Sequence, residues 1–131
     1  MKNYYLSVFL LLFSTSIAQE ILFITPTQGL QGENNISVTL VASGVNFYEE
    51  YSWHDVYFED NDLVIQNEVV TSSNTLNFDL TISSDANVGY HAIYLQGESY
   101  WDWYDDVLYN AFYVNENLAE LTSITPNEFD A

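Results

Sequence analysis

The chain of 131 residues contains no cysteine. Small secreted domains that cannot build a sufficient apolar core are usually held together by disulfides, and that solution is excluded here. The same absence excludes a cysteine nucleophile and a lipoprotein anchored through an N-terminal cysteine. Stability must come from an apolar core, for which 48% hydrophobic and 17% aromatic residues supply ample material.

Basic residues are almost as rare, because one Lys or Arg stands against 19 Asp and Glu for a net charge of −18. The single basic residue is Lys2, and every acidic residue lies at or beyond Glu20. Nothing is available to neutralise phosphate, so nucleic acid and anionic lipid are excluded as partners. The acidity suits either solubility in salty surroundings, where ions screen charge within roughly 10 Å, or the binding of divalent cations.

The N-terminus has the pattern of a secretory signal peptide. Met1-Lys2-Asn3 gives a positive start, residues 4–13 are almost wholly apolar, and Ser16-Ile17-Ala18 supplies small residues for cleavage. We expect a signal peptide at 1–18, cleaved after Ala18, and a secreted or cell-surface product. Membrane insertion is not expected, because the apolar run is shorter than the ~20 consecutive apolar residues that a bilayer core of ~30 Å needs.

Alternation of apolar and polar residues dominates the rest of the chain, most clearly at 36–42 and 76–82. Such alternation predicts half-buried antiparallel strands, and helical periodicity is lacking beyond the signal peptide. Further strands are expected at 21–25, 56–58, 63–65, 69–70, 90–96 and 107–114. About seven short strands predict an all-β, immunoglobulin-like antiparallel β-sandwich. The alternation places the following residues in its core: Val38, Leu40, Val56, Phe58, Leu76, Phe78, Leu80, Ile93, Phe112 and Val114.

A short repeat indicates the domain organisation. Ile24-Thr25-Pro26 recurs as Ile124-Thr125-Pro126, each time after a short apolar stretch. The interval suits one immunoglobulin-like module of about 100 residues. We therefore expect one domain at 19–116, and a linker with the start of a second repeat at 117–131.

Several short motifs resemble one known family. The Ile24-Thr25-Pro26 opening, Gly44-Val45-Asn46-Phe47, Val56-Tyr57-Phe58, the turn 85–89 and the closing strand 110–114 occur in the order and spacing of an IPT/TIG-type immunoglobulin-like domain. The resemblance implies one module of a secreted bacterial multi-repeat surface protein.

Two features depart from the family pattern. His91 stands where bacterial members commonly carry an aromatic residue, and Gly97 to Asp106 reads as an inserted loop between the last two strands. Long loops on a rigid sandwich are where binding usually resides.

Catalytic signatures are missing. The chain has no Gly-x-Ser-x-Gly elbow, no phosphate-cradling glycine-rich loop and no paired metal-binding histidines. His54 and Asp55 are neighbours on an expected strand, so their side chains point to opposite faces. An enzyme would need a deep cleft lined by Glu98, Asp102 and Asp105, and we expect no enzymatic activity.

Two acidic clusters are candidate Ca²⁺ sites, because each offers several hard oxygens within short reach. Neither has the spacing of an EF-hand, and turns rich in Asp and Asn are also the usual way to reverse a chain. The two clusters are Glu59, Asp60 and Asp62 in an expected turn, and Asp102, Asp105 and Asp106 in the expected loop. No other cofactor is expected.

Aromatic residues in the loop 97–106 are the candidate ligand-binding residues: Tyr100, Trp101, Trp103 and Tyr104. Exposed rings beside carboxylates suit sugar recognition, whereas rings two residues apart could equally cap the core from one face of a strand. The expected function is a spacer or adhesion module that contacts a protein or glycan at the cell surface and neighbouring immunoglobulin-like repeats. The alternative is a carbohydrate-binding accessory module that works through the loop 97–106.

Overall fold

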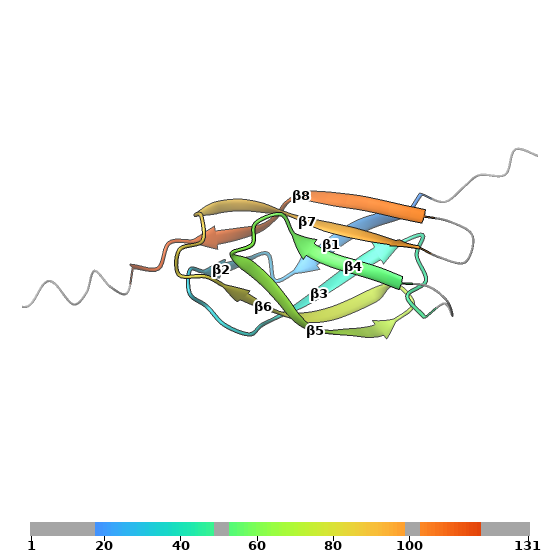
Figure 1. Ribbon diagram of the computed structural model, residues 1–131, viewed down its shortest axis with the longest axis horizontal. Helices are drawn as coiled ribbons and strands as arrows, with labels where there is room; N and C mark the ends of the chain where they lie inside the picture. Colours follow the sequence, from blue (N-terminus) through green and yellow to red (C-terminus); the bar gives the residue numbers. More distant parts are fainter. Residues whose placement is uncertain (1–17, 49–52, 99–102, 119–131) are drawn as a thin grey trace, which may run out of the picture.

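The computed structural model describes residues 18–48, 53–98 and 103–118, and this part of the chain forms two four-stranded sheets without a long helix (Figure 1). The strands are β1 (Glu20–Thr25), β2 (Gln28–Leu30), β3 (Ile36–Ser43), β4 (Trp53–Phe58), β5 (Leu63–Ser72), β6 (Thr75–Ile82), β7 (Gly89–Glu98) and β8 (Trp103–Asn115). No described helix is long and apolar enough to cross a membrane.

The two sheets differ in one pairing. Sheet A has the order β1-β3-β6-β5, and all of its pairs are antiparallel. Sheet B has the order β2-β8-β7-β4, in which β2 runs parallel to β8 and the other pairs are antiparallel. The all-β prediction is confirmed, with eight strands in place of about seven.

One strand that the sequence did not predict, β2, follows Pro26. Because proline has no N–H to donate to a ladder, β1 ends at Thr25, as expected, and the chain resumes as β2 in the other sheet. Farther along, the two short strands expected at 63–65 and 69–70 are one strand, β5. It contains a bulge between Gln66 and Val69, where Asn67 takes a positive φ of 54°. The extra residues of a bulge interrupt the alternation, which explains the false division.

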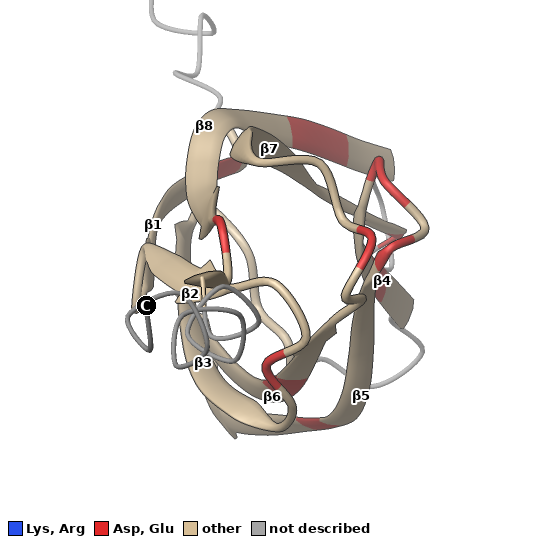
Figure 2. Cartoon of the chain, turned by 90° about the vertical axis from the view of Figure 1, so that its left-hand side faces the viewer, with Lys and Arg blue, Asp and Glu red and all other residues tan. Residues whose placement is uncertain are grey.

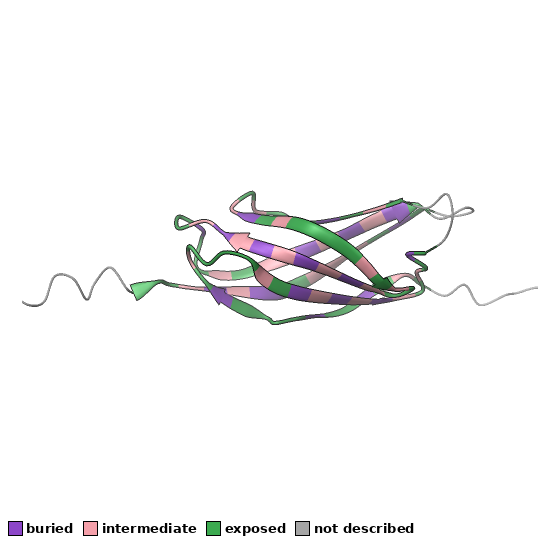
Figure 3. Cartoon of the chain, turned by 90° about the horizontal axis from the view of Figure 1, so that it is seen from below, coloured by how far each residue is buried: buried purple, intermediate pink, exposed green. Residues whose placement is uncertain are grey.

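The core lies between the sheets, and the prediction for it is confirmed at all ten positions. Buried and less buried residues alternate through much of β3, β4 and β7 and along the whole of β6 (Figure 3). Phe58 and Phe112 meet edge to face within the core, with ring centroids 6.1 Å apart. Burial of such side chains contributes roughly 25 cal/mol per Å² of apolar surface, which replaces the stabilisation that disulfides would supply.

The structure corrects the prediction of a loop at Gly97 to Asp106. β7 continues through Glu98 and β8 begins at Trp103, so most of this segment belongs to a long hairpin. Tyr104 lies opposite Gly97, and Trp103 lies opposite Glu98. Trp and Tyr are good strand formers, and the ladder therefore extends over residues for which the sequence predicts an inserted loop.

The described chain enters and leaves the sandwich at opposite ends, since β1 begins at one end and β8 finishes at the other (Figure 1). Residues 1–17 of the expected signal peptide, and residues 119–131 of the expected linker and start of a second repeat, lie outside the described residues.

Candidate functional site

The outer face of sheet B carries aromatic side chains in rows across β4, β7 and β8. Residues directly opposite in an antiparallel pair project to the same face. In the first row Glu98 lies between Trp53 and Trp103. The two indoles are 41% and 56% exposed, their centroids are 5.3 Å apart and their planes meet at 67°. The indole N–H of Trp53 donates to Glu98 Oε2 at 3.2 Å, which orients this ring along the row.

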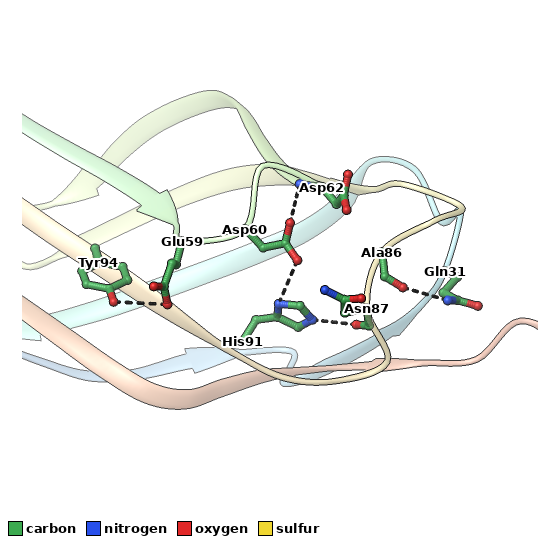
Figure 4. Close-up of polar contacts among 8 residues, drawn as sticks. All are labelled: Gln31, Glu59, Asp60, Asp62, Ala86, Asn87, His91 and Tyr94. Atoms are coloured by element: carbon green, nitrogen blue, oxygen red, sulfur yellow. Dashed lines mark hydrogen bonds and ion pairs between the residues drawn. The ribbon is translucent and has the colours of Figure 1, made fainter.

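A second aromatic row consists of Tyr57, Tyr94 and Val107. The two phenol rings stack with centroids 5.2 Å apart and planes only 4° from parallel. The Tyr94 hydroxyl donates to Glu59 Oε2 at 3.4 Å (Figure 4). Partial burial raises the pKa of Tyr94 above its ordinary value of 10.0, and the negative charge of Glu59 adds to this effect.

Polar residues form the row between the two aromatic rows: Asp55, Gln96 and Asp105. Asp55 and Asp105 are exposed, and neither carboxylate makes a hydrogen bond or ion pair with another described residue. A shallow depression of about 230 Å³ lies beside this row. Its lining is Tyr57, Tyr94, Leu95, Gln96, Asp105, Asp106 and Val107.

We call these three rows together the aromatic face. Strands in a sheet lie about 4.8 Å apart and every second residue advances about 7 Å along a strand, so the face measures roughly 10 Å by 14 Å between Cα atoms. All charged side chains on this face are acidic, because the described part of the chain holds no Lys or Arg (Figure 2). The face therefore combines π-electron density with negative charge.

The residues expected to bind a ligand are divided by the strand pairing. Trp103 belongs to the aromatic face. Tyr104, the next residue, points to the opposite side, is only 7% exposed and belongs to the core cluster. Tyr100 and Trp101 lie outside the described residues.

The sequence reasoning missed Trp53, Tyr57 and Tyr94 as parts of the site. A signal for β4 was present, because Trp53, Asp55 and Tyr57 occupy every second position and so share a face. Nothing in the sequence alone indicated that Tyr94, from a distant strand, would lie against Tyr57.

The acidic cluster at 59–62 forms an ordered turn. Asp60 Oδ1 accepts the backbone N–H of Asp62 at 2.9 Å, and Asp60 Oδ2 lies 3.7 Å from His91 Nδ1 (Figure 4). Glu59 points to Tyr94 instead. The carboxylates of Glu59 and Asp60, two of the three in the cluster, thus already contact other groups of the protein.

The second acidic cluster is separated by the pleat of β8. Asp106 Oδ2 accepts the backbone N–H of Ile21 at 2.7 Å and so ties β8 to β1, whereas Asp105 lies on the aromatic face. Asp102 lies outside the described residues. Within 18–48, 53–98 and 103–118, no group of three or more His, Asp or Glu side chains is arranged to hold a metal ion.

Both histidines make local structural contacts. His54 contacts the Glu68 carboxylate and packs on the Phe47 ring at a centroid distance of 5.0 Å. His91 Nε2 lies 2.8 Å from the backbone carbonyl of Asn87, which connects the strand to its preceding turn. Neither histidine lies on the aromatic face.

No protein-family model matches the chain, and comparisons with curated proteins and with solved structures give no match either.

Proposed function

We propose that this chain is a non-enzymatic immunoglobulin-like interaction module of a secreted or cell-surface protein, and that it binds its partner through the aromatic face. The observation that carries the proposal is the gathering of Trp53, Tyr57, Tyr94 and Trp103 on one side of sheet B. Exposed aromatic clusters rimmed by polar groups are typical of interaction sites on soluble proteins.

The strand order supports the immunoglobulin-like assignment. Constant-type immunoglobulin domains pair strands A, B, E and D in one sheet and C, F and G in the other. If β1 and β2 are the two parts of a divided strand A, sheet A follows the first order and β4, β7 and β8 follow the second. On this count the eight strands correspond to the seven of the fold.

Three features support a place in a longer surface protein. The signal-like N-terminus favours export, the copy of the Ile24-Thr25-Pro26 motif near the C-terminus favours a second repeat, and the described chain begins and ends at opposite ends of the sandwich. Modules joined in this way would form an extended array. Weak contacts of single modules would then add through high effective concentration.

A carbohydrate-binding accessory module is the second candidate. Trp103 favours it, because its ring is 56% exposed and lies beside the carboxylate of Glu98. An aromatic ring can stack on the apolar face of a sugar while an acid accepts hydroxyl hydrogen bonds. Because Trp53 is inclined at 67° to Trp103, the pair offers one stacking ring and not a flat two-ring platform.

Calorimetric titration of the module tests the proposal. The probes are a basic decapeptide, an acidic decapeptide and cellohexaose, and product formation from the sugar is followed in parallel. The face variant Tyr57→Ser/Trp103→Ser is compared with Val64→Ser/Val69→Ser, which changes two exposed residues of β5.

We expect saturable binding of one probe, lost in the face variant, retained in the β5 variant and without turnover. Thermal melting shows that both variants fold. Binding that survives in the face variant, or no binding of any probe, would contradict the proposal.

A further inference from the structure

We infer that the aromatic face binds cationic side chains, Arg or Lys, of a basic polypeptide segment. This inference rests on the proposed function, because it takes the aromatic face as the binding surface and assigns the chemistry of the partner.

Charge is the first argument. Asp55 and Asp105 are exposed on the middle row and have no partner among the described residues. Glu98 adds a third carboxylate in the next row and shares one oxygen with the Trp53 indole N–H. The described part of the chain holds no Lys or Arg, and neither histidine lies on the aromatic face, so the face has no basic side chain of its own. A partner with positive side chains is the electrostatic complement of this surface.

The aromatic rows give the second argument. A cation is attracted to the face of a Trp or Tyr ring when it lies within about 6 Å of the ring centroid, and Arg does this most often. The middle row is one pleat repeat, about 7 Å, from each aromatic row. The depression brings the two kinds of group together, because Asp105, Tyr57 and Tyr94 all line it. One guanidinium in this depression would meet a carboxylate and a phenol ring at once.

Ring geometry favours a cation over a neutral sugar chain. Tyr57 and Tyr94 stack in parallel, so that each ring covers one face of the other, and Trp53 is turned against Trp103. Neither pair presents two coplanar rings on which consecutive sugars could lie. A neutral glycan would also leave Asp55 and Asp105 without a counter-charge.

The spacing of the rows matches an extended peptide. Alternate residues of an extended chain are about 7 Å apart, which equals the distance from one row to the next. A segment lying along β7 would place one basic side chain over Gln96. The basic side chains two residues before and after it would then lie over Glu98 and Tyr94.

The test measures binding of a decapeptide of alternating Gly and Arg to the module by calorimetric titration, at low and at high salt. The same peptide with citrulline, the neutral isostere of Arg, is the ligand control. The variant Asp55→Asn/Asp105→Asn removes the middle carboxylates. Its matched control, Asp85→Asn/Glu116→Gln, removes the same charge at two exposed acids elsewhere.

We expect Asp55→Asn/Asp105→Asn to weaken binding of the Arg peptide about fivefold, as the loss of two exposed ion pairs implies, and Asp85→Asn/Glu116→Gln to weaken it less than twofold. The citrulline peptide should not bind, and 1 M salt should weaken Arg binding because screening then acts within about 3 Å. Trp103→Leu should also weaken it, whereas Tyr90→Leu, at the other end of β7, should not.

An equal loss in the two charge variants would show general attraction to an acidic protein and overturn the inference. A third outcome is that the module binds cellohexaose but not the Arg peptide, and that Tyr57→Ser/Trp103→Ser loses the binding of cellohexaose. This outcome would overturn the inference and leave the proposed function standing. If the Arg peptide, the acidic decapeptide and cellohexaose all fail to bind, both the inference and the proposed function are overturned.

Discussion

Gly97 lies directly opposite Tyr104 in the β7–β8 hairpin, and the lack of a side chain at Gly97 provides the space that the Tyr104 ring occupies. A Cβ atom at this position would meet that ring and would lie 2.6 Å from the backbone oxygen of Trp53. The pleat of β8 turns Tyr104 inward and leaves its neighbour Trp103 on the aromatic face, and Gly97 leaves room for the inward ring. The small residue on β7 therefore accommodates the pairing that leaves Trp103 available to a partner.

Gly97→Ala should destabilise the module by about 1–3 kcal/mol, because overpacking displaces the ring or separates β4 from β7. The free energy of unfolding from denaturant titration measures the effect. Gln96→Ala, an outward substitution on the same strand, should change it by less than about 0.5 kcal/mol. Equal values for the two variants would show that Tyr104 does not need this space.

Phe78→Ala should cost about 3–5 kcal/mol, because the ring is only 2% exposed and its removal leaves a cavity between the sheets. Val64→Ala, at an exposed position of β5, provides the comparison and should have little effect. Denaturant midpoints at constant slope give both values. A loss below about 1 kcal/mol for Phe78→Ala would contradict the packing of β6 into the core.

Added salt should raise the melting temperature, since 19 acidic residues repel one another without basic partners and mobile ions screen that repulsion. Calcium should add no more than magnesium at equal ionic strength, because the described acids do not gather into a metal site. Calorimetric melting in matched chloride salts checks both expectations. A larger shift with millimolar calcium would indicate a specific site.

Tyr94 should titrate above its ordinary pKa of 10.0, because partial burial and the Glu59 charge both disfavour the phenolate. Since the folded-state pKa is the higher one, the stabilisation from the neutral phenol is present below pH 10.0 and is lost as pH rises through the Tyr94 pKa. Glu59→Gln should lower that pKa, and Asp85→Asn should not. Tyrosine-specific NMR titration follows the residue, and a Tyr94 pKa at or below 10.0 would contradict the contact.

Much of the fold follows from the sequence because one face of each strand is buried. Period-two alternation then dictates which side chains point inward, and Leu76, Phe78, Leu80 and Ile82 on β6 are buried as this rule requires. Pro26 lacks the N–H that a ladder needs, so the end of β1 is also a local property. The composition alone excluded disulfides and internal Lys or Arg salt bridges in the sandwich.

The candidate site depended on the tertiary structure. Trp53, Glu98 and Trp103 form one row only because β4, β7 and β8 pair in one particular register, and a shift by a single residue would send every side chain to the other face. Register reflects packing between residues that are distant in the chain, such as Tyr57 against Tyr94 and Gly97 beneath Tyr104. Local sequence determined which residues could be exposed on a strand, and only the pairing of the strands determined which of them share a surface.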